Sequence, residues 1–517
     1  MSSIKILWVD DEIDLLRSHL MFLEQRDYKI VPCNNGQDAL TQIKSTKFDA
    51  VLLDENMPGL NGLETLNEMK SILPNLPIIM ITKNEEEQIM EEAIGAKISD
   101  YLIKPVNPNQ ILLALKKLFQ HKNLIQEKTI NDYQQEFRKI SLELNELDTH
   151  EKWADFYLKM VYWEMELEGL EDLGMLEIFQ NQMKEANRFF AKFISQNYSS
   201  WIQDNSGPVL SNQILKEKLF PKIKIGDKKT TLLLVVDNLR YDQWKMISPI
   251  IQDHYQIEEE LPYFSILPTA THYARNAIFS GLMPSEMEKH HPNLWVNEND
   301  KGRKNLNEKS FLMSQLKRNQ LNLKFNYSKI TNLKAGRDLV AQIQNYQNED
   351  LFVVVYNFVD MISHAKTNME IIKELASDNK AFRSLTLSWF KNSPLLEIIQ
   401  KASELGFKLV VTTDHGTINV DQAIEVIGTK KTSTNLRYKT GQSMSFKGKE
   451  VLEIKEPNKL KLPSANLNSK YIFAKEQGYF VYQNNFNHFA NHFRNTFQHG
   501  GISMEEMIIP FIVMHPR

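Results

Sequence analysis

The feature that most constrains the fold is a recurring pattern, a short run of aliphatic and β-branched residues that ends in an acidic residue. It occurs as KILWVDD and DAVLLD near the N-terminus, and as LLLVVD, FVVVYNFVD and LVVTTD in the second half of the chain. Such continuously apolar runs are typical of strands buried on both faces of a parallel sheet. Functional side chains in such sheets lie beyond the carboxyl ends of the strands. The pattern therefore predicts an α/β multidomain protein with two acidic sites.

Length and composition fit a large globular protein. A chain of 517 residues favours about three domains, and 42% hydrophobic with 24% charged residues permits a large core. The net charge of -4 argues against a chain that coats nucleic acid, although a local basic patch remains possible. The single cysteine, Cys33, excludes an internal disulfide and suits a reducing compartment.

No targeting or membrane segment is evident in the sequence. The N-terminus MSSIKILWVDDE lacks the charged-then-apolar pattern of a signal peptide. Apolar runs such as LFVVVYNFV are much shorter than the roughly 18 residues that a membrane span needs. We therefore expect a cytoplasmic protein without membrane insertion.

Residues 1–120 alternate five apolar runs with amphipathic stretches, which predicts a parallel sheet with helices on both faces. Polar side chains end four of these runs: Asp10, Asp11, Asp54, Thr82 and Lys104. Converging carboxylates either bind a hard cation or shift their pKa values, and magnesium readily combines carboxylates, water and a phosphoryl group. With a hydroxyl and an ammonium in the same crevice, the pattern predicts a site that places a phosphoryl group on Asp54.

The motifs WVDDE, LLDENMPGLNG, MITK and DYLIKPV resemble the response-regulator receiver domain over this whole segment. The resemblance implies a flavodoxin-like fold and a magnesium ion held by three acids: Asp10, Asp11 and Asp54. It also implies that Asp54 accepts phosphate from a sensor histidine kinase, that Thr82 and Lys104 contact the phosphoryl oxygens, and that Tyr101 is the switch residue. The alternative is a group of solvated strand-end acids and a structural lysine.

Residues 121–215 are predicted to form a helical bundle, because no proline occurs between Pro108 and Pro208 and glycines are few. An apolar stripe with helical spacing follows a capping residue, Thr149; its members are Trp153, Phe156, Tyr157, Met160 and Val161. We expect the stripe to pack inside the bundle, with a partner groove as the alternative. Since this segment follows the receiver, we predict that it transmits the effect of receiver phosphorylation to the rest of the chain. We expect this to occur through a phosphorylation-dependent homodimer.

Residues 216–517 return to an α/β pattern and place six metal-ligand types of side chain after apolar runs: Asp237, Asp360, His364, Asp414, His415 and His499. This mixture of carboxylate and imidazole suits zinc better than magnesium or calcium. Six ligands and a hydroxyl suffice for two zinc ions, an arrangement that stabilises the attacking and leaving oxygens of phosphoryl transfer. Thr271, within PTATHYARNAIFSG, is the candidate nucleophile because a zinc-bound hydroxyl loses its proton readily.

The same series of residues looks like the alkaline phosphatase superfamily, close to its phosphodiesterase and nucleotide pyrophosphatase branch, and HGGISMEEMIIPF is similar to its PglZ domain. The resemblance implies one zinc ion held by three residues: Asp360, His364 and His499. It implies a second zinc ion held by three others: Asp237, Asp414 and His415. Receiver, helical middle and PglZ-type end together resemble PorX-type response regulators, which are associated with type IX protein secretion.

A phosphodiester is the favoured substrate, because the Thr271 motif is nearer the diesterase pattern and no third metal site is evident. Arg275 could neutralise a substrate phosphate or form a salt bridge that packs its helix. Residues 429–449 carry six Lys or Arg, among them Arg437 and Lys439, and no acidic residue. This segment could bind a nucleotide or short oligonucleotide, or be a solvated loop. His272 has no assigned role.

Two functional classes remain open. In the first, phosphorylation controls a zinc-dependent phosphodiesterase. In the second, the zinc domain is structural or binds a partner, such as a sigma factor or a secretion component. The hydroxyl of Thr271 favours catalysis, because a structural zinc site is normally closed by its ligands. Direct promoter binding is the weaker alternative, since no helix-turn-helix is evident.

Overall fold

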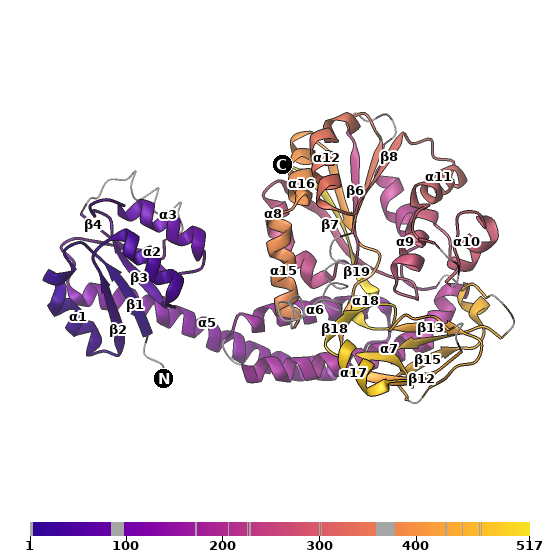
Figure 1. Cartoon of the computed structure of the whole chain (residues 1–517), viewed down its shortest axis with the longest axis horizontal. Helices are drawn as coiled ribbons and strands as arrows, with labels where there is room; N and C mark the ends of the chain where they lie inside the picture. Colours follow the sequence, from indigo (N-terminus) through magenta and orange to yellow (C-terminus); the bar gives the residue numbers. More distant parts are fainter. Residues whose placement is uncertain are drawn as a thin grey trace. The chain divides into compact units, whose positions relative to one another are not determined.

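The computed structural model describes residues 4–517 apart from 84–97, 171–172, 205, 225, 227–228, 299, 301, 358–377, 430–431, 447, 465 and 467, with only the backbone of 120–125, 127 and 173. The chain forms two compact units, Met1–Asp132 and Tyr133–Arg517 (Figure 1). Each unit has a buried apolar core of its own.

The first unit is a parallel five-stranded sheet in the order β2-β1-β3-β4-β5. The strands are β1 (Ile4–Val9), β2 (Tyr28–Cys33), β3 (Ala50–Asp54), β4 (Ile78–Thr82) and β5 (Asp100–Ile103). The helices are the single turn η1 (Ile13–Leu16), α1 (Arg17–Glu24), α2 (Gly36–Ser45), α3 (Gly62–Ile72) and the start of α5 (Pro108–Glu143). Side chains alternate along β1, so Ile6 and Trp8 join one core cluster and Leu7 and Val9 the other. Helices therefore cover both faces, and the predicted flavodoxin-like fold is confirmed.

The second unit begins with the end of α5 and two further helices, α6 (His150–Glu168) and α7 (Leu173–Asp204). The predicted stripe lies on α6 and is buried. Trp153 packs against Phe190 of α7 with ring centroids 5.3 Å apart, and Tyr157 meets Tyr241 at 6.4 Å. The stripe thus packs within the helical middle region and against the α/β region that follows.

A six-stranded sheet forms the centre of the α/β region, in the order β7-β19-β10-β6-β9-β8. Its strands are β6 (Thr231–Val236), β7 (Tyr255–Phe264), β8 (Phe325–Ile330), β9 (Leu351–Tyr356), β10 (Lys408–Thr412) and β19 (Ile508–Pro516). β8, β9, β6 and β10 pair in parallel, while β19 is antiparallel to both β10 and β7. The apolar runs LLLVV and LVVT are fully buried in β6 and β10. Their parallel pairing brings the residues that follow each strand to the same edge of the sheet.

Helices surround this sheet (Figure 1). They are α8 (Tyr241–Gln252), α9 (Thr271–Ser280), α10 (Pro284–His290), α11 (Glu308–Arg318), α12 (Leu333–Gln342), α15 (Asn379–Lys391), α16 (Pro394–Glu404) and α18 (Met504–Met507). One further helix, α17 (Phe486–Phe493), packs against β17 (Gly478–Tyr482) instead of this sheet. Single turns also occur among the described residues: η2 (Leu215–Leu219), η3 (Phe220–Lys222), η4 (Ile343–Tyr346) and η5 (Pro457–Leu460).

Three smaller sheets are inserted between β10 and β19 in the sequence, and so extend from the carboxyl end of β10. They are β14-β12-β17, β13-β16-β15 and the pair β11-β18. Their strands are β11 (Ile418–Val420), β12 (Gln422–Ile427), β13 (Tyr438–Gly441), β14 (Ser445–Phe446), β15 (Val451–Ile454), β16 (Lys470–Ala474), β17 (Gly478–Tyr482) and β18 (Thr496–Gln498). These sheets place the residues after β18 beside those after β10, because β11 pairs with β18.

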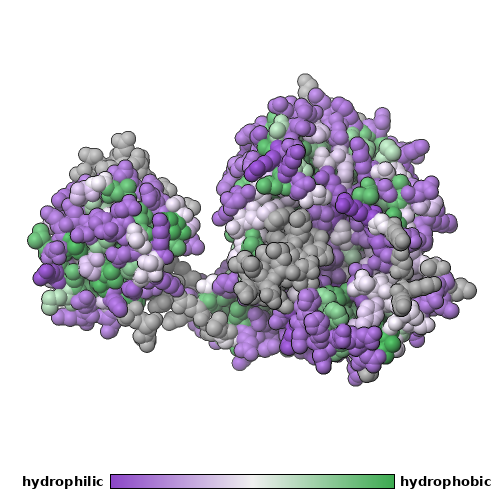
Figure 2. Space-filling model, in the orientation of Figure 1, coloured by the Kyte–Doolittle hydropathy of each residue, from purple (hydrophilic) through white to green (hydrophobic). Residues whose placement is uncertain are grey.

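The visible surface of both units is mostly hydrophilic, with small separate apolar patches (Figure 2). Of the helices that the structure describes, none is both long and apolar enough to cross a bilayer.

A buried ion-pair network joins the helical middle region to the α/β region. Arg383 of α15 is 1% exposed and pairs with Asp242 of α8 and with Glu168 of α6. Its Nη1 also lies 3.4 Å from Glu164 Oε2. One guanidinium therefore offsets the charge of carboxylates from two different helices, and removing it would leave buried charge uncompensated.

We expect Arg383→Met to destabilise the second unit by about 3–5 kcal/mol, because it leaves Glu164 and Glu168 without their ion-pair partner. Asp242 keeps its pair with Arg240. The control is Arg188→Met on α7, whose exposed side chain pairs with Glu185 at 3.2 Å and should contribute less than about 1 kcal/mol. Urea unfolding followed by tryptophan fluorescence measures both, since every tryptophan except Trp8 belongs to the second unit. Equal unfolding midpoints for the two variants would contradict this assignment.

Candidate active site

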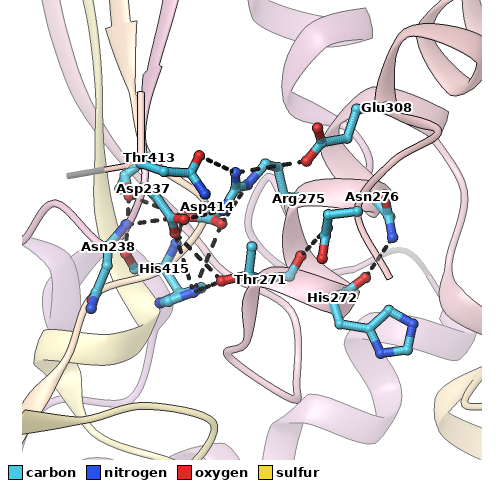
Figure 3. Close-up of polar contacts among 12 residues, drawn as sticks. Asp237, Asn238, Thr271, His272, Arg275, Asn276, Glu308, Thr413, Asp414 and His415 are labelled. Carbon is cyan, nitrogen blue, oxygen red and sulfur yellow. Dashed lines mark hydrogen bonds and ion pairs between the residues drawn. The ribbon is translucent and has the colours of Figure 1, made fainter. Parts of the chain in front are cut away.

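Four of the residues predicted for the C-terminal site converge at the carboxyl edge of the large sheet (Figure 3). Asp237 follows β6, Asp414 and His415 follow β10, and Thr271 opens α9. The ligand atoms of the two aspartates and His415 lie within 4.8 Å of one another. Thr271 Oγ1 is 3.1 Å from His415 Nε2 and 3.4 Å from Asp237 Oδ1. The hydroxyl therefore adjoins a cluster of three fully buried ligand-type groups.

The two histidines of this region are fixed in one tautomer. His415 Nδ1 lies 3.0 Å from the carbonyl oxygen of Gly416, and His499 Nδ1 lies 3.1 Å from that of Thr269. A carbonyl oxygen only accepts, so each Nδ1 carries the proton and each Nε2 carries the lone pair. Metal-binding histidines are oriented in this way. The two rings stack with centroids 4.2 Å apart, which places His499 directly beside the cluster.

Arg275 lies between the two aspartates. Its Nη2 pairs with Asp237 Oδ2, its Nε is 3.0 Å from Asp414 Oδ2, and its Nη1 is 2.9 Å from Asn357 Oδ1. The side chain is completely buried, so the structure favours the salt-bridge alternative for Arg275 over an open phosphate contact. Burial would raise the pKa of the Asp414 carboxyl, but the guanidinium of Arg275 and the hydrogen bond from the backbone N–H of Asn238 hold that pKa well below its usual range.

The donor set fits a zinc ion. Two carboxylates and one imidazole with its Nε2 lone pair are common zinc ligands, and a neighbouring hydroxyl offers a further oxygen. The other predicted zinc ion has three predicted ligands: Asp360, His364 and His499. Of these, the structure describes His499, whose ring stacks on that of His415. The other two, Asp360 and His364, lie outside the described residues.

The first unit contains the other predicted site. Ligand atoms of Asp10, Asp11 and Asp54 lie within 4.8 Å of one another, with Asp11 exposed and the others buried. Lys104 Nζ lies 3.0 Å from Asp10 Oδ2 and 2.8 Å from Asp54 Oδ1. Burial raises the pKa of Asp54 despite the opposing effect of the Lys104 ammonium. Three clustered carboxylates with one open side suit magnesium, which keeps several waters.

The two remaining predicted residues of this unit differ in exposure. Thr82 is buried, and its hydroxyl donates a hydrogen bond to the carboxylate of Glu55. Tyr101 on β5 is 37% exposed, so its ring is accessible at the surface of the unit. The carboxylate of Glu55 beside Thr82 was not anticipated from the sequence, although it directly follows Asp54.

Known protein families match three segments of the chain. Residues 214–514 match the BREX system PglZ alkaline phosphatase-like domain. The chain belongs to the PglZ alkaline phosphatase-like family. Residues 6–116 match the response regulator receiver domain and residues 123–202 match the PorX response regulator linker domain. The chain is thus a PorX-like response regulator with a receiver, a linker and a PglZ domain.

Individual relatives match over a smaller part of the chain. The transcriptional regulatory protein ResD of Bacillus subtilis is 35% identical over 116 residues, which are 22% of this chain and 48% of ResD. The transcriptional regulatory protein ZraR of Escherichia coli O157:H7 is 32% identical over 127 residues, 25% of this chain and 29% of ZraR. The chain therefore spans less than half the length of either relative.

Among solved structures, the chemotaxis protein CheY4 of Vibrio cholerae is similar at 28% identity, covering 22% of this chain and 97% of that chain with a TM-score of 0.21. A receiver domain protein of Methanospirillum hungatei matches at 27% identity, covering 24% of this chain and 98% of that chain with a TM-score of 0.23.

His272 follows the candidate nucleophile of the PglZ domain but belongs to a different cluster. Its ring points away from the three ligand-type residues (Figure 3) and stacks on Trp295 with centroids 4.5 Å apart. Its Nδ1 lies 3.4 Å from Glu298 Oε2, which also accepts hydrogen bonds from the hydroxyls of Tyr273 and Tyr438. His272 therefore helps to build a polar and aromatic wall beside the start of α9.

Two residues of the basic segment 429–449 are buried in the PglZ domain, whereas a solvated loop would leave them in water. Arg437 is completely buried and pairs with Glu506. Lys439 is 1% exposed, and its Nζ lies 4.4 Å from the ring centroid of Tyr482. Burial lowers the pKa of Lys439 to about 7. Both residues belong to the core of the small sheets because the start of β13 is buried on both faces.

Several residues that shape the site were not predicted. The backbone of Asn238 has a φ of 63°, a conformation that asparagine tolerates well, and its N–H donates to Asp414 Oδ1 at 3.2 Å. Asn305 donates to the carbonyl oxygen of Thr271 at 3.0 Å. The asparagine after LLLVVD was a usable signal for the turn at Asn238. Nothing near Asn305 in the sequence indicates its contact.

We expect Glu298→Gln to destabilise the PglZ domain at neutral pH. Burial would raise the pKa of Glu298, but the hydrogen bond from His272 and the charge of Lys304 lower it from 4.5 to about 2. A lowered pKa stabilises the fold above pH 4.5, and that stability is lost as the pH falls toward 2, so the substitution should cost up to about 3 kcal/mol near pH 7.

Urea unfolding from about pH 7 down to about pH 3.5 tests this expectation, with Glu177→Gln at an exposed position as the control. The difference between the Glu298 variant and the wild type should narrow as the pH falls below 4.5. A difference that stays constant over this range would show that the charge of Glu298 does not stabilise the fold.

Proposed function

We propose that this chain is a response regulator whose PglZ domain is a zinc-dependent phosphodiesterase controlled by phosphorylation of Asp54. The observation that carries the proposal is the contact of Thr271 Oγ1 with His415 Nε2 at 3.1 Å, beside the carboxylates of Asp237 and Asp414. A hydroxyl placed among metal-ligand groups is suited to nucleophilic attack on phosphorus.

Thr271 is the proposed nucleophile. Zinc bound by Asp237, Asp414 and His415 would favour the ionised form of its hydroxyl. Thr271 is the first residue of α9, so the backbone N–H groups of the first turn favour an anionic phosphate there. Oγ1 attacks phosphorus, one ester P–O bond breaks, and an alcohol leaves. The intermediate keeps the second ester group, so it is a phosphodiester between Thr271 and the remaining alcohol. Water then hydrolyses its bond to Thr271, which releases a phosphate monoester and restores the hydroxyl.

His499 is proposed as a ligand of a second zinc ion, together with Asp360 and His364. Its ring lies 4.2 Å from that of His415, which supports two neighbouring ions. Two ions a few ångströms apart are known to stabilise both oxygens of an in-line displacement at phosphorus.

A phosphodiester is proposed as the substrate because Arg275 is already paired with two aspartates. A monoester carries one more negative charge than a diester, and a site that prefers it needs additional positive charge. Asp237 and Asp414 already hold the guanidinium of Arg275, so this cation is committed to the ligand groups. We propose short nucleotide or oligonucleotide diesters as the substrates.

The receiver is proposed to control this activity. A sensor histidine kinase would phosphorylate Asp54 with magnesium held by Asp10, Asp11 and Asp54, and Lys104 already contacts the acceptor carboxylate at 2.8 Å. Tyr101 is accessible enough to change position, which supports a role as the switch that promotes a homodimer. The resemblance to PorX-type regulators extends the proposal to control of type IX secretion.

A second candidate function is a partner-binding zinc module without catalysis, acting on a sigma factor or a secretion component. The same comparison with PorX-type regulators motivates it. The position of the Thr271 hydroxyl among the ligand groups favours the catalytic proposal, because a purely structural zinc site would need no such group.

Hydrolysis of a chromogenic phosphodiester and of the matched monoester by zinc-loaded protein tests the proposal. We expect zinc-dependent cleavage that prefers the diester and falls by at least about 10³-fold in Thr271→Val. Thr271→Ser, which keeps a hydroxyl, should retain a measurable part of the activity. Zinc content is determined on each variant, so that loss of the nucleophile is separated from loss of metal. Two bound zinc ions without cleavage of either ester would favour the partner-binding alternative.

A further inference from the structure

Helix α18 lies between the linker helix α7 and the candidate active site. On its outer side it is held by Asn187 of α7, a completely buried residue. Asn187 Oδ1 accepts from the backbone N–H of Met504 at 2.9 Å, and its Nδ2 donates to both carboxylate oxygens of Glu505 at 3.1 and 3.0 Å. One amide from the linker thus holds the first residue of α18 and the side chain of the second.

On the inner side of α18, Glu506 holds the turn that follows His499. Its Oε1 accepts from the backbone N–H of Gly501 at 2.8 Å, and its Oε2 accepts from Ser503 Oγ at 2.8 Å. The guanidinium of Arg437 pairs with the same carboxylate, so the buried charge is compensated. Consecutive residues of α18 therefore face the linker and the His499 turn.

Thr269 ties that turn to the nucleophile turn. Its Oγ1 donates to the carbonyl oxygen of Gly501 at 2.9 Å and accepts from the N–H of Gly500 at 3.0 Å. Its own carbonyl oxygen accepts from His499 Nδ1 at 3.1 Å. Thr269 precedes Thr271 by two residues. The orientation of the His499 ring and the start of α9 are therefore set by one residue.

The close packing of the turn leaves it little freedom. Gly500 has a φ of +117°, a conformation that residues with a side chain rarely adopt. A Cβ on Gly501 would lie 2.4 Å from the carbonyl oxygen of Ala474 and 2.8 Å from the Arg437 guanidinium. Motion of α18 would therefore be passed to His499 rather than absorbed within the turn.

We infer that Asn187, Glu506 and Thr269 are positioning residues that couple the linker to the metal centre through α18. The inference rests on the proposed function, because it takes His499 as a metal ligand and Thr271 as the nucleophile. The inference adds a route by which a displacement of α7 changes the positions of His499 and Thr271 together. Arg437 then acts through Glu506 rather than by touching the substrate.

Metal binding by the full chain tests the inner half of this route. Zinc affinity is measured by competition with a chelator, and ligand geometry by the absorption spectrum of the cobalt-loaded protein. Thr269→Val keeps the volume but loses the hydrogen bonds of the hydroxyl, and we expect it to lower the affinity for one of the two metal ions about 10–100-fold and to alter the cobalt spectrum. Thr269→Ser keeps the hydroxyl and should restore the wild-type affinity and spectrum.

The outer half is tested with two buried amides of α7. Asn187→Leu removes the contacts to α18, whereas Gln182→Leu removes only contacts to α5, made to Tyr133, Phe137 and Ser141. We expect Asn187→Leu to alter the cobalt spectrum and to lower kcat more than it raises KM. The Gln182 variant should leave the spectrum and the kinetics unchanged, although both variants lose a buried hydrogen-bonded group.

The outcomes separate the inference from the proposed function. If the wild type binds two metal ions and both Thr269→Val and Asn187→Leu keep its affinities and spectrum, the coupling is overturned and the metal centre stands. Equal spectral changes in the Asn187 and Gln182 variants would also overturn it, because they would reflect general loosening of α7. If the wild type binds no metal ion, the proposed centre is wrong and the coupling falls with it.

Discussion

The pairing of two buried carboxylates with one buried guanidinium is the interaction on which the PglZ domain depends. Parallel pairing of β6 with β10 brings Asp237 and Asp414 together, and Arg275 offsets their repulsion inside the fold. The remaining net negative charge, together with the oriented Nε2 of His415, is what a divalent cation requires. Thr271 is the first residue of α9, and its hydroxyl lies beside Asp237 and His415. Stability and proposed chemistry therefore rest on the same few groups.

The linker contributes to this arrangement from two sides. On one side, Arg383 joins α15 to carboxylates of α6. On the other side, Asn187 of α7 holds α18, whose Glu506 fixes the His499 turn. Directed hydrogen bonds and buried ion pairs have a single favourable geometry, so they transmit displacement to the groups that they hold.

The sequence predicts the parts of this protein that follow from local pattern. Apolar runs ending in Asp10, Asp54, Asp237 and Asp414 identify the central strands and the edge at which functional groups collect. The small sheets were not predicted, because their strands are short and pair across distant segments. The burial of Arg437 could not be anticipated either, because its pairing with Glu506 depends on tertiary packing. The same holds for the contact of Asn187 with Glu505. Asp360 and His364 remain sequence predictions, because they lie outside the described residues.

The most direct measurement of the central claim is the rate of diester cleavage by the zinc-loaded chain before and after phosphorylation. Acetyl phosphate with magnesium supplies the phosphoryl group, intact-protein mass spectrometry gives the occupancy, and Asp54→Asn is the control. The account predicts that the rate changes with occupancy in the wild type and stays constant in the variant. A wild type that carries the phosphoryl group on Asp54 and cleaves at an unchanged rate would contradict control of the PglZ domain by the receiver.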